Sequence, residues 1–81
     1  MEFQRGRVVR ATAGRDKGGF FVVLQVSGDF ALICDGKRRP LEKLKKKKLL
    51  HLSLTGTVLP DGSIKTNREI RKALQPLVGA G

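Results

Sequence analysis

The chain has 81 residues, of which 17 are Lys or Arg and 7 are Asp or Glu, so its formal charge is +10. This length leaves room for one small domain with a thin core, and it excludes a deep interior of the kind that a large catalytic pocket needs. The hydrophobic share of 40% is enough for a folded domain, so the positive charge is a surface property that attracts polyanions, with nucleic acid as the first candidate.

Cysteine content and hydropathy indicate the cellular compartment. Cys34 is the only cysteine, so the chain offers no intramolecular disulfide and no cysteine-rich metal site, which fits a reducing cytosol. The chain begins with polar and charged residues, and its longest apolar run, Phe20 to Leu24, is far shorter than the roughly 20 residues of a membrane-spanning helix. We therefore expect a cytoplasmic protein that does not associate with membranes. We also expect a monomer.

The first part of the chain has the pattern of three strands joined by turns. Apolar and polar residues alternate from Gly6 to Ala13, whereas Phe20 to Val26 and Phe30 to Cys34 are almost continuously aromatic or aliphatic. The connections, Gly14 to Gly19 and Ser27 to Asp29, are rich in residues that favour turns. We therefore expect a three-stranded meander.

The segment from Lys37 to Lys48 concentrates the positive charge, because it contains eight Lys or Arg residues and a single acid, Glu42. Pro40 argues against a regular helix or a central strand, so we expect an extended basic arm or edge loop that stays solvated. The leucines that follow predict a short strand from Leu49 to Leu54, and Gly56 to Leu59 can add a fifth.

The C-terminal part predicts a turn followed by a short helix. Pro60 to Ser63 has strong turn chemistry, and Thr66 lies three residues before Glu69, which is the spacing of a reciprocal helix cap. We expect Pro76 to limit this amphipathic helix to about two or three turns and the tail from Val78 to Gly81 to fray.

Five short strands separated by tight turns favour an all-β fold in which a small barrel closes on itself. Closure removes the exposed pairing edges that an open sheet of this size would have. The expected architecture is a five-stranded SH3-like barrel over residues 1–59, including the basic arm 37–48. A turn, a short C-terminal helix and a frayed tail then occupy residues 60–81.

The stretch from Gly6 to Val26 resembles the KOW motif of ribosomal proteins and transcription elongation factors. With Val8 counted first, Gly18 matches the characteristic glycine at the eleventh position of the motif. The similarity extends to small bacterial KOW proteins related to large-subunit ribosomal proteins over Asp35 to Lys37 and Pro40 to Leu52. The resemblance covers about two thirds of the chain, and it implies an SH3-like barrel whose partner is structured RNA, commonly ribosomal RNA.

Basic side chains of the glycine-rich loop and the arm are the candidate contacts for RNA, because neutralised phosphates supply much of the affinity for nucleic acid. The candidate RNA-binding residues are Arg7, Arg10, Arg15, Lys17, Lys37, Arg38, Arg39, Lys43, Lys45, Lys46, Lys47 and Lys48. A guanidinium can grip a phosphate with two bonds or stack on an unpaired base, so Arg15, Arg38 and Arg39 are the candidates for recognition. The glycines Gly14, Gly18 and Gly19 are expected to shape the loop, and Gly18 to adopt a backbone conformation that residues with a Cβ avoid.

Two adjacent phenylalanines, Phe20 and Phe21, must point to opposite faces of the second strand. One ring is expected in the core. The other could stack on a base, but the more ordinary outcome is that it packs under a loop or the C-terminal helix.

No constellation of residues supports catalysis or a metal site. His51 has no Cys, Asp or Glu beside it at metal-ligand spacing, and Cys34 lies in an apolar strand, where a thiol behaves as a small hydrophobic group. We therefore expect a non-enzymatic protein without cofactor or metal. The resemblance to KOW proteins, together with the positive charge, implies that it binds RNA on or near the large ribosomal subunit, where ribosomal proteins are further candidate partners. The alternative is a protein-interaction module, because SH3-like barrels also bind acidic or extended peptides and the KOW domains of elongation factors contact proteins.

Overall fold

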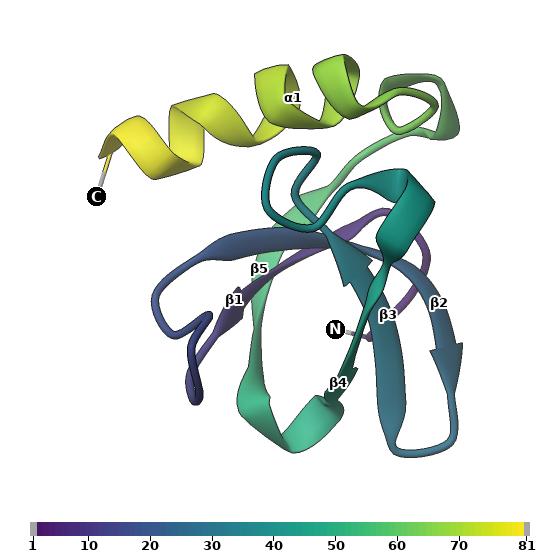
Figure 1. Ribbon diagram of the computed structural model, residues 1–81, viewed down its shortest axis with the longest axis vertical. Helices are drawn as coiled ribbons and strands as arrows, with labels where there is room; N and C mark the ends of the chain where they lie inside the picture. The colour runs from purple at the N-terminus through teal and green to yellow at the C-terminus, as the bar shows by residue number, and fades with distance from the viewer. Residues whose placement is uncertain (1, 81) are drawn as a thin grey trace.

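Over residues 2–80, which the computed structural model describes, five strands form one antiparallel sheet in the order β4-β3-β2-β1-β5 (Figure 1). The strands are β1 (Arg7–Ala11), β2 (Phe20–Ser27), β3 (Phe30–Cys34), β4 (Lys45–Lys48) and β5 (Leu52–Val58). The same range contains the 3-10 helices η1 (Leu41–Lys43), η2 (Leu49–His51) and η3 (Asp61–Ser63), and the helix α1 (Asn67–Ala80), which lies across the sheet. The predicted meander is confirmed, because β2 pairs with both β1 and β3.

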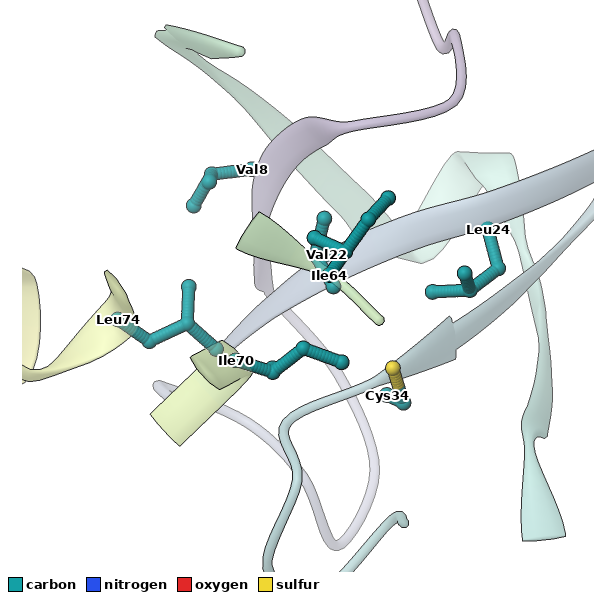
Figure 2. Packing of buried hydrophobic residues seen from close by; sticks show 7 residues of the cluster. All are labelled: Val8, Val22, Leu24, Cys34, Ile64, Ile70 and Leu74. Atoms are coloured by element: carbon teal, nitrogen blue, oxygen red, sulfur yellow. The ribbon is translucent and has the colours of Figure 1, made fainter. Parts of the chain in front are cut away.

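Both faces of the sheet are buried. Val8 and Val9 are adjacent on β1 and so face opposite sides, yet neither is exposed to solvent. The cluster on the side of α1 comprises Val8, Val22, Leu24, Cys34, Ile64, Ile70 and Leu74 (Figure 2). The cluster on the other side comprises Val9, Ala11, Phe21, Val23, Ala31, Ile33 and Leu52. The two phenylalanines divide as expected, since Phe21 is buried in the second cluster and Phe20 packs against the first.

The sheet curls strongly, because its two edge strands are consecutive in the chain. Only η2 separates β4 from β5, and a connection of this length spans at most about 14 Å when fully extended. A flat five-stranded sheet would hold its edges about 19 Å apart. Two backbone bonds support the curl: Leu49 N donates to Asp29 O at 2.8 Å, and Thr12 N donates to the carbonyl of His51, in η2, at 2.9 Å. Within residues 2–80 no ladder joins β4 to β5, so the edges approach each other without hydrogen-bonded closure.

The basic segment differs from the expectation of a loop, because Lys45 to Lys48 form β4 and pair with β3. Alternation along the strand explains how a run of lysines is tolerated. Lys47 points to the covered side and is 9% exposed, whereas the ammonium of Lys46 lies 4.4 Å from the centroid of the Phe30 ring. Lys46 and Lys48 are exposed to water at the edge of the sheet, and their positive charge discourages pairing with the same strand of a second copy of the chain.

The strand expected from Leu49 to Leu54 begins only at Leu52, because η2 takes the first three of these residues and leaves Leu50 85% exposed. β5 then continues through Gly56 to Val58, so the two strands expected here are one. The number of strands is nevertheless five, because β4 replaces the missing strand.

The predicted cap of α1 is present in a modified form. Glu69 N donates to Thr66 Oγ1 at 3.1 Å, and the Thr66 hydroxyl donates to the Glu69 carboxylate at 3.0 Å. Asn67 fastens η1 to the beginning of the helix, because its side-chain oxygen accepts a bond from Leu41 N at 2.8 Å and its amide donates to Glu42 at 2.6 Å. The helix is therefore tied to the chain that leads into β4.

The expected end of the helix at Pro76 is wrong, because α1 continues to Ala80. Leu74 and Leu77, on either side of the proline, pack against the helix-side cluster, and this burial offsets the one backbone bond that proline removes. The frayed tail expected from Val78 is helical as far as the described residues extend, and Gly81 lies outside them. None of the helices in residues 2–80 combines the length and the apolar character that crossing a membrane requires.

Candidate nucleic-acid interface

The glycine-rich loop between β1 and β2 is a tightly bonded turn. Gly18 N donates to Ala11 O at 2.7 Å, and Lys17 N donates to Gly14 O at 3.2 Å. Gly14 and Gly18 have φ of 77° and 89°, which residues with a Cβ rarely adopt, so the prediction for Gly18 is confirmed. The loop thus holds a fixed shape, and it presents the exposed side chains of Arg15 and Lys17 to solvent.

A buried carboxylate, Asp16, ties this loop to the basic segment. Its side chain is 8% exposed and accepts bonds from Arg39 Nη2 at 3.2 and 3.4 Å. The Lys47 ammonium lies 3.9 Å from the same carboxylate and donates to Ala13 O at 2.8 Å. Because one acid holds two cations, the loop, the turn that contains Arg39 and strand β4 are fixed relative to one another.

The turn over residues 35–39 is held from within and from α1. Asp35 Oδ1 accepts bonds from the backbone N of Lys37 and Arg39, both at 2.9 Å, as expected for an aspartate in a turn. Gly36 has φ of 76° and lies so close to the backbone of α1 that a Cβ would collide with it. Arg71 of the helix donates to Gly36 O at 3.1 Å. The turn is therefore clamped onto the helix.

The glycine-rich loop, the turn over residues 35–39 and helix α1 form the walls of a cleft of about 560 Å³. In Figure 1 the loop, in dark blue, and the yellow C-terminal part of α1 lie on the same side of the molecule. Among the described residues the cations that line the cleft are Arg15, Lys17, Lys37, Arg38 and Arg71, and the carboxylates are Asp16 and Asp35. The apolar part of the lining consists of Phe20, Phe21, Leu74 and Val78. The cations outnumber the carboxylates, and Asp16 is already paired with Arg39 and Lys47, so the cleft is suited to anions.

The structure brings only some of the predicted RNA-binding residues to this cleft. Arg15, Lys17, Lys37 and Arg38 line it, although the loop and the turn are about 20 positions apart in the sequence. The other exposed candidates lie outside the cleft: Arg10 is on β1, Lys43 is on η1, and Lys46 and Lys48 are on β4. Lys45, also on β4, is half-buried. The guanidinium of Arg10 lies 5.9 Å from the centroid of the Phe20 ring.

Three other candidates have partners inside the protein. Arg7 is 8% exposed, and it donates to Glu2 O at 3.0 Å and to Thr55 O at 3.1 Å. Arg39 and Lys47 hold Asp16 as described above. These side chains support the surface from beneath, so we leave them out of the candidate interface.

Sequence reasoning missed Arg71. The pattern of α1 marks its apolar stripe, Ile70 and Leu74, but the residue beside that stripe carries no signal until the turn that it contacts is known. The missing information is tertiary, because Gly36 and Arg71 meet only when the helix lies on the sheet.

Cys34 is inert under ordinary conditions. Burial raises the pKa of its thiol to about 12, with Asp35 adding to the effect, so the thiol is neutral near pH 7.

In the part of the chain that the structure describes, no three His, Cys, Asp or Glu side chains are grouped so that they could hold a metal ion. The groups assembled at the cleft can donate hydrogen bonds and attract anions.

Comparison with known proteins adds no family to this picture. The sequence matches no model of a protein family, and no curated protein matches it. The resemblance to KOW proteins therefore depends on residues of this chain alone, namely the loop around Gly18 and the segments that follow it.

Proposed function

We propose that the protein binds structured RNA without catalysing a reaction, and that the cleft between the glycine-rich loop, the 35–39 turn and α1 is the centre of the interface. The observation that carries this proposal is the convergence of five cations, from a loop, a turn and a helix, on one cleft in residues 2–80. Like charges repel one another, and a site that gathers them gains most when a polyanion neutralises them. The phosphates of RNA supply such a charge at regular spacing.

The fold supports the same proposal. We infer an SH3-like barrel of the KOW type, because the sheet has five strands, curls strongly and joins its edge strands through a single 3-10 turn. The positive φ of Gly18 agrees with the place of the characteristic glycine in the KOW resemblance. Ribosomal RNA of the large subunit, in the cytoplasm, is the partner that this resemblance suggests.

The exposed basic residues divide into two groups with different roles. The lysines of β4 that remain in water, Lys46 and Lys48, add sequence-independent attraction to phosphates. Arg15 and Arg38 lie at the cleft, where a planar guanidinium can bind a phosphate with two bonds or stack on a base. Recognition is therefore assigned to the cleft and general attraction to the strand.

A protein-interaction module is the second candidate, and the free edge of β4 favours it. An edge strand rich in lysine offers backbone groups and positive charge to an extended acidic peptide, which could add to the sheet as a further strand. The apolar side chain of Leu50, 85% exposed just beyond this strand, would give such a peptide a contact.

Sedimentation of the tagged protein in a cell lysate separates these functions. At low salt we expect the protein to travel with large ribosomal particles and to return to the top of the gradient after ribonuclease or high salt. A complex that survives ribonuclease would favour the protein-interaction module. Protein found only at the top, with the ribosomal particles intact, would contradict the ribosomal assignment.

A further inference from the structure

The cleft has a property that attraction to phosphates does not require. Cations line it, but the lining also includes apolar groups: Phe20 is half-buried, Leu74 is 3% exposed, and Val78 is 62% exposed. A paired RNA helix presents phosphates, sugars and the edges of its bases, and the flat faces of the bases are stacked inside, so it has no base face to place against this lining. Apolar and cationic side chains in one cleft fit a ligand that has a flat apolar part and an anionic part.

We propose that the cleft holds one unpaired nucleotide of the bound RNA, with the base against Phe20 and Val78 and the phosphate at Arg15, Lys37 and Arg38. This inference rests on the proposed function and names the part of the RNA that the site takes. A volume of about 560 Å³ lies within the range of roughly 300–1,000 Å³ of pockets that bind small ligands. Unpaired bases in proteins stack on aromatic rings and guanidinium planes, and both occur here.

The walls of the cleft are already in place, which lowers the cost of binding. Asp16 fixes the loop through Arg39 and Lys47, and Arg71 fixes the turn through Gly36 O. Because these bonds exist without a ligand, a nucleotide would not have to order the loop or the turn when it binds. Arg71 itself also lines the cleft.

A titration with nucleotides followed by amide NMR tests the inference. The probes are AMP, UMP and ribose 5-phosphate at one ionic strength, and the last has the sugar and the phosphate but no base. We expect the nucleotides to bind at least about fivefold more tightly than ribose 5-phosphate, and the affected amides to be those of the cleft, such as Gly19, Lys37 and Gln75. Equal affinity for the three probes would overturn the inference.

Substitution of the ring separates stacking from charge. Phe20→Leu keeps an apolar side chain but removes the ring, and Phe30→Leu is the matched control because Phe30 is also half-buried and lies outside the cleft. We expect Phe20→Leu to reduce the preference for AMP over ribose 5-phosphate several-fold, and Phe30→Leu to leave it unchanged. An unchanged preference in a folded Phe20→Leu variant would contradict the inference.

Charge is tested in the same way with two exposed arginines. Arg38 lines the cleft, whereas Arg68, on α1, does not. We expect Arg38→Gln to weaken AMP binding at least about threefold and Arg68→Gln to leave it within error. A hexaglutamate peptide that bound the cleft more tightly than AMP, and whose affinity fell in Arg38→Gln, would assign the cleft to acidic peptides and overturn the inference.

Two RNAs distinguish failure of this inference from failure of the proposed function. One is a duplex without unpaired residues, and the other has the same number of phosphates with an internal looped-out base. A protein that binds both RNAs equally, with strong dependence on salt, keeps its RNA-binding function while the cleft inference fails. A protein that binds neither RNA at low salt contradicts the proposed function itself.

Discussion

A single carboxylate, Asp16, determines which cations face solvent at the glycine-rich loop. It is 8% exposed and takes Arg39 and Lys47 as partners, so these two cations are directed inward. Arg15 and Lys17, on either side of it, remain exposed. The local sequence shows a charged loop with three glycines. It gives no sign that Asp16 pairs with Arg39 and Lys47, which lie 23 and 31 positions further along the chain. The ion pairs were therefore beyond prediction, although the loop was not.

The burial of Lys47 leads to the first prediction. Lys47→Met should destabilise the protein by about 2 kcal/mol, because it removes a charged hydrogen bond to Ala13 O and one partner of Asp16. Lys48→Met, at an exposed position of the same strand, should change stability by less than about 0.5 kcal/mol. Urea denaturation measures both, and similar values for the two variants would show that Lys47 is not a structural residue. Variants made to test RNA binding by the lysines of β4 should therefore keep Lys47, because its substitution would also change stability.

The second prediction concerns the pH dependence of stability through Cys34. Burial raises the pKa of the thiol from the usual 9.0 to about 12 in the folded protein, so unfolding releases a proton between these values and stability falls as pH rises from about 9 to about 12. Between pH 8 and pH 10 this thiol should cost about 1 kcal/mol of stability. The Cys34→Ala variant lacks this contribution and should lose correspondingly less over the same interval. Parallel pH profiles from urea denaturation of the two proteins would refute the role given to the thiol.

At the scale of elements, the meander and the capped helix follow from local patterns, and the remaining elements depend on tertiary contacts. Lys45 to Lys48 has no strand-like composition, and it forms β4 because β3 offers a partner at the edge of the sheet. Pro76 favours the end of a helix, but Leu77 has an apolar cluster to pack against, so α1 continues. In both cases packing overrides local propensity.

The loop between β1 and β2 gives the prediction that belongs to this scale. Gly18→Val should destabilise the protein by about 1–2 kcal/mol, because φ of 89° is unfavourable for a β-branched residue although the Cβ has open space around it. Gly56→Val is the matched control, since a Cβ at Gly56 also meets open space but the backbone there is an ordinary strand. Thermal unfolding compares the two, and a Gly18→Val variant as stable as Gly56→Val would contradict the importance of the loop conformation.

At the scale of the whole molecule, the curl of the sheet and the position of α1 convert separate basic segments into one site. The net charge of +10 predicts attraction to a polyanion but not where the polyanion binds. The candidate site is defined only when the loop, the 35–39 turn and Arg71 meet at one cleft. Residues on the loop and the turn could be proposed from the sequence, because they are basic and flanked by glycine. Arg71, Leu74 and Val78 could not, because their place depends on how the helix lies on the sheet.

At this scale we propose above all that the cations of the cleft, and not the net charge alone, bind RNA. The salt dependence of affinity for one ribosomal RNA fragment tests it in two variants that each lack four positive charges of the parent. The cleft variant replaces Arg15, Lys17, Lys37 and Arg38 by Gln, and the matched variant replaces in the same way the exposed residues Arg5, Lys65, Arg68 and Lys72, which do not line the cleft and are not among the candidate RNA-binding residues. We predict that the cleft variant binds at least about tenfold more weakly and that its log-log salt slope falls by about 0.7–0.9 for each phosphate that it no longer neutralises, while the matched variant stays close to the parent. Equal reductions of affinity and slope in the two variants would contradict the claim, because binding would then follow the total charge.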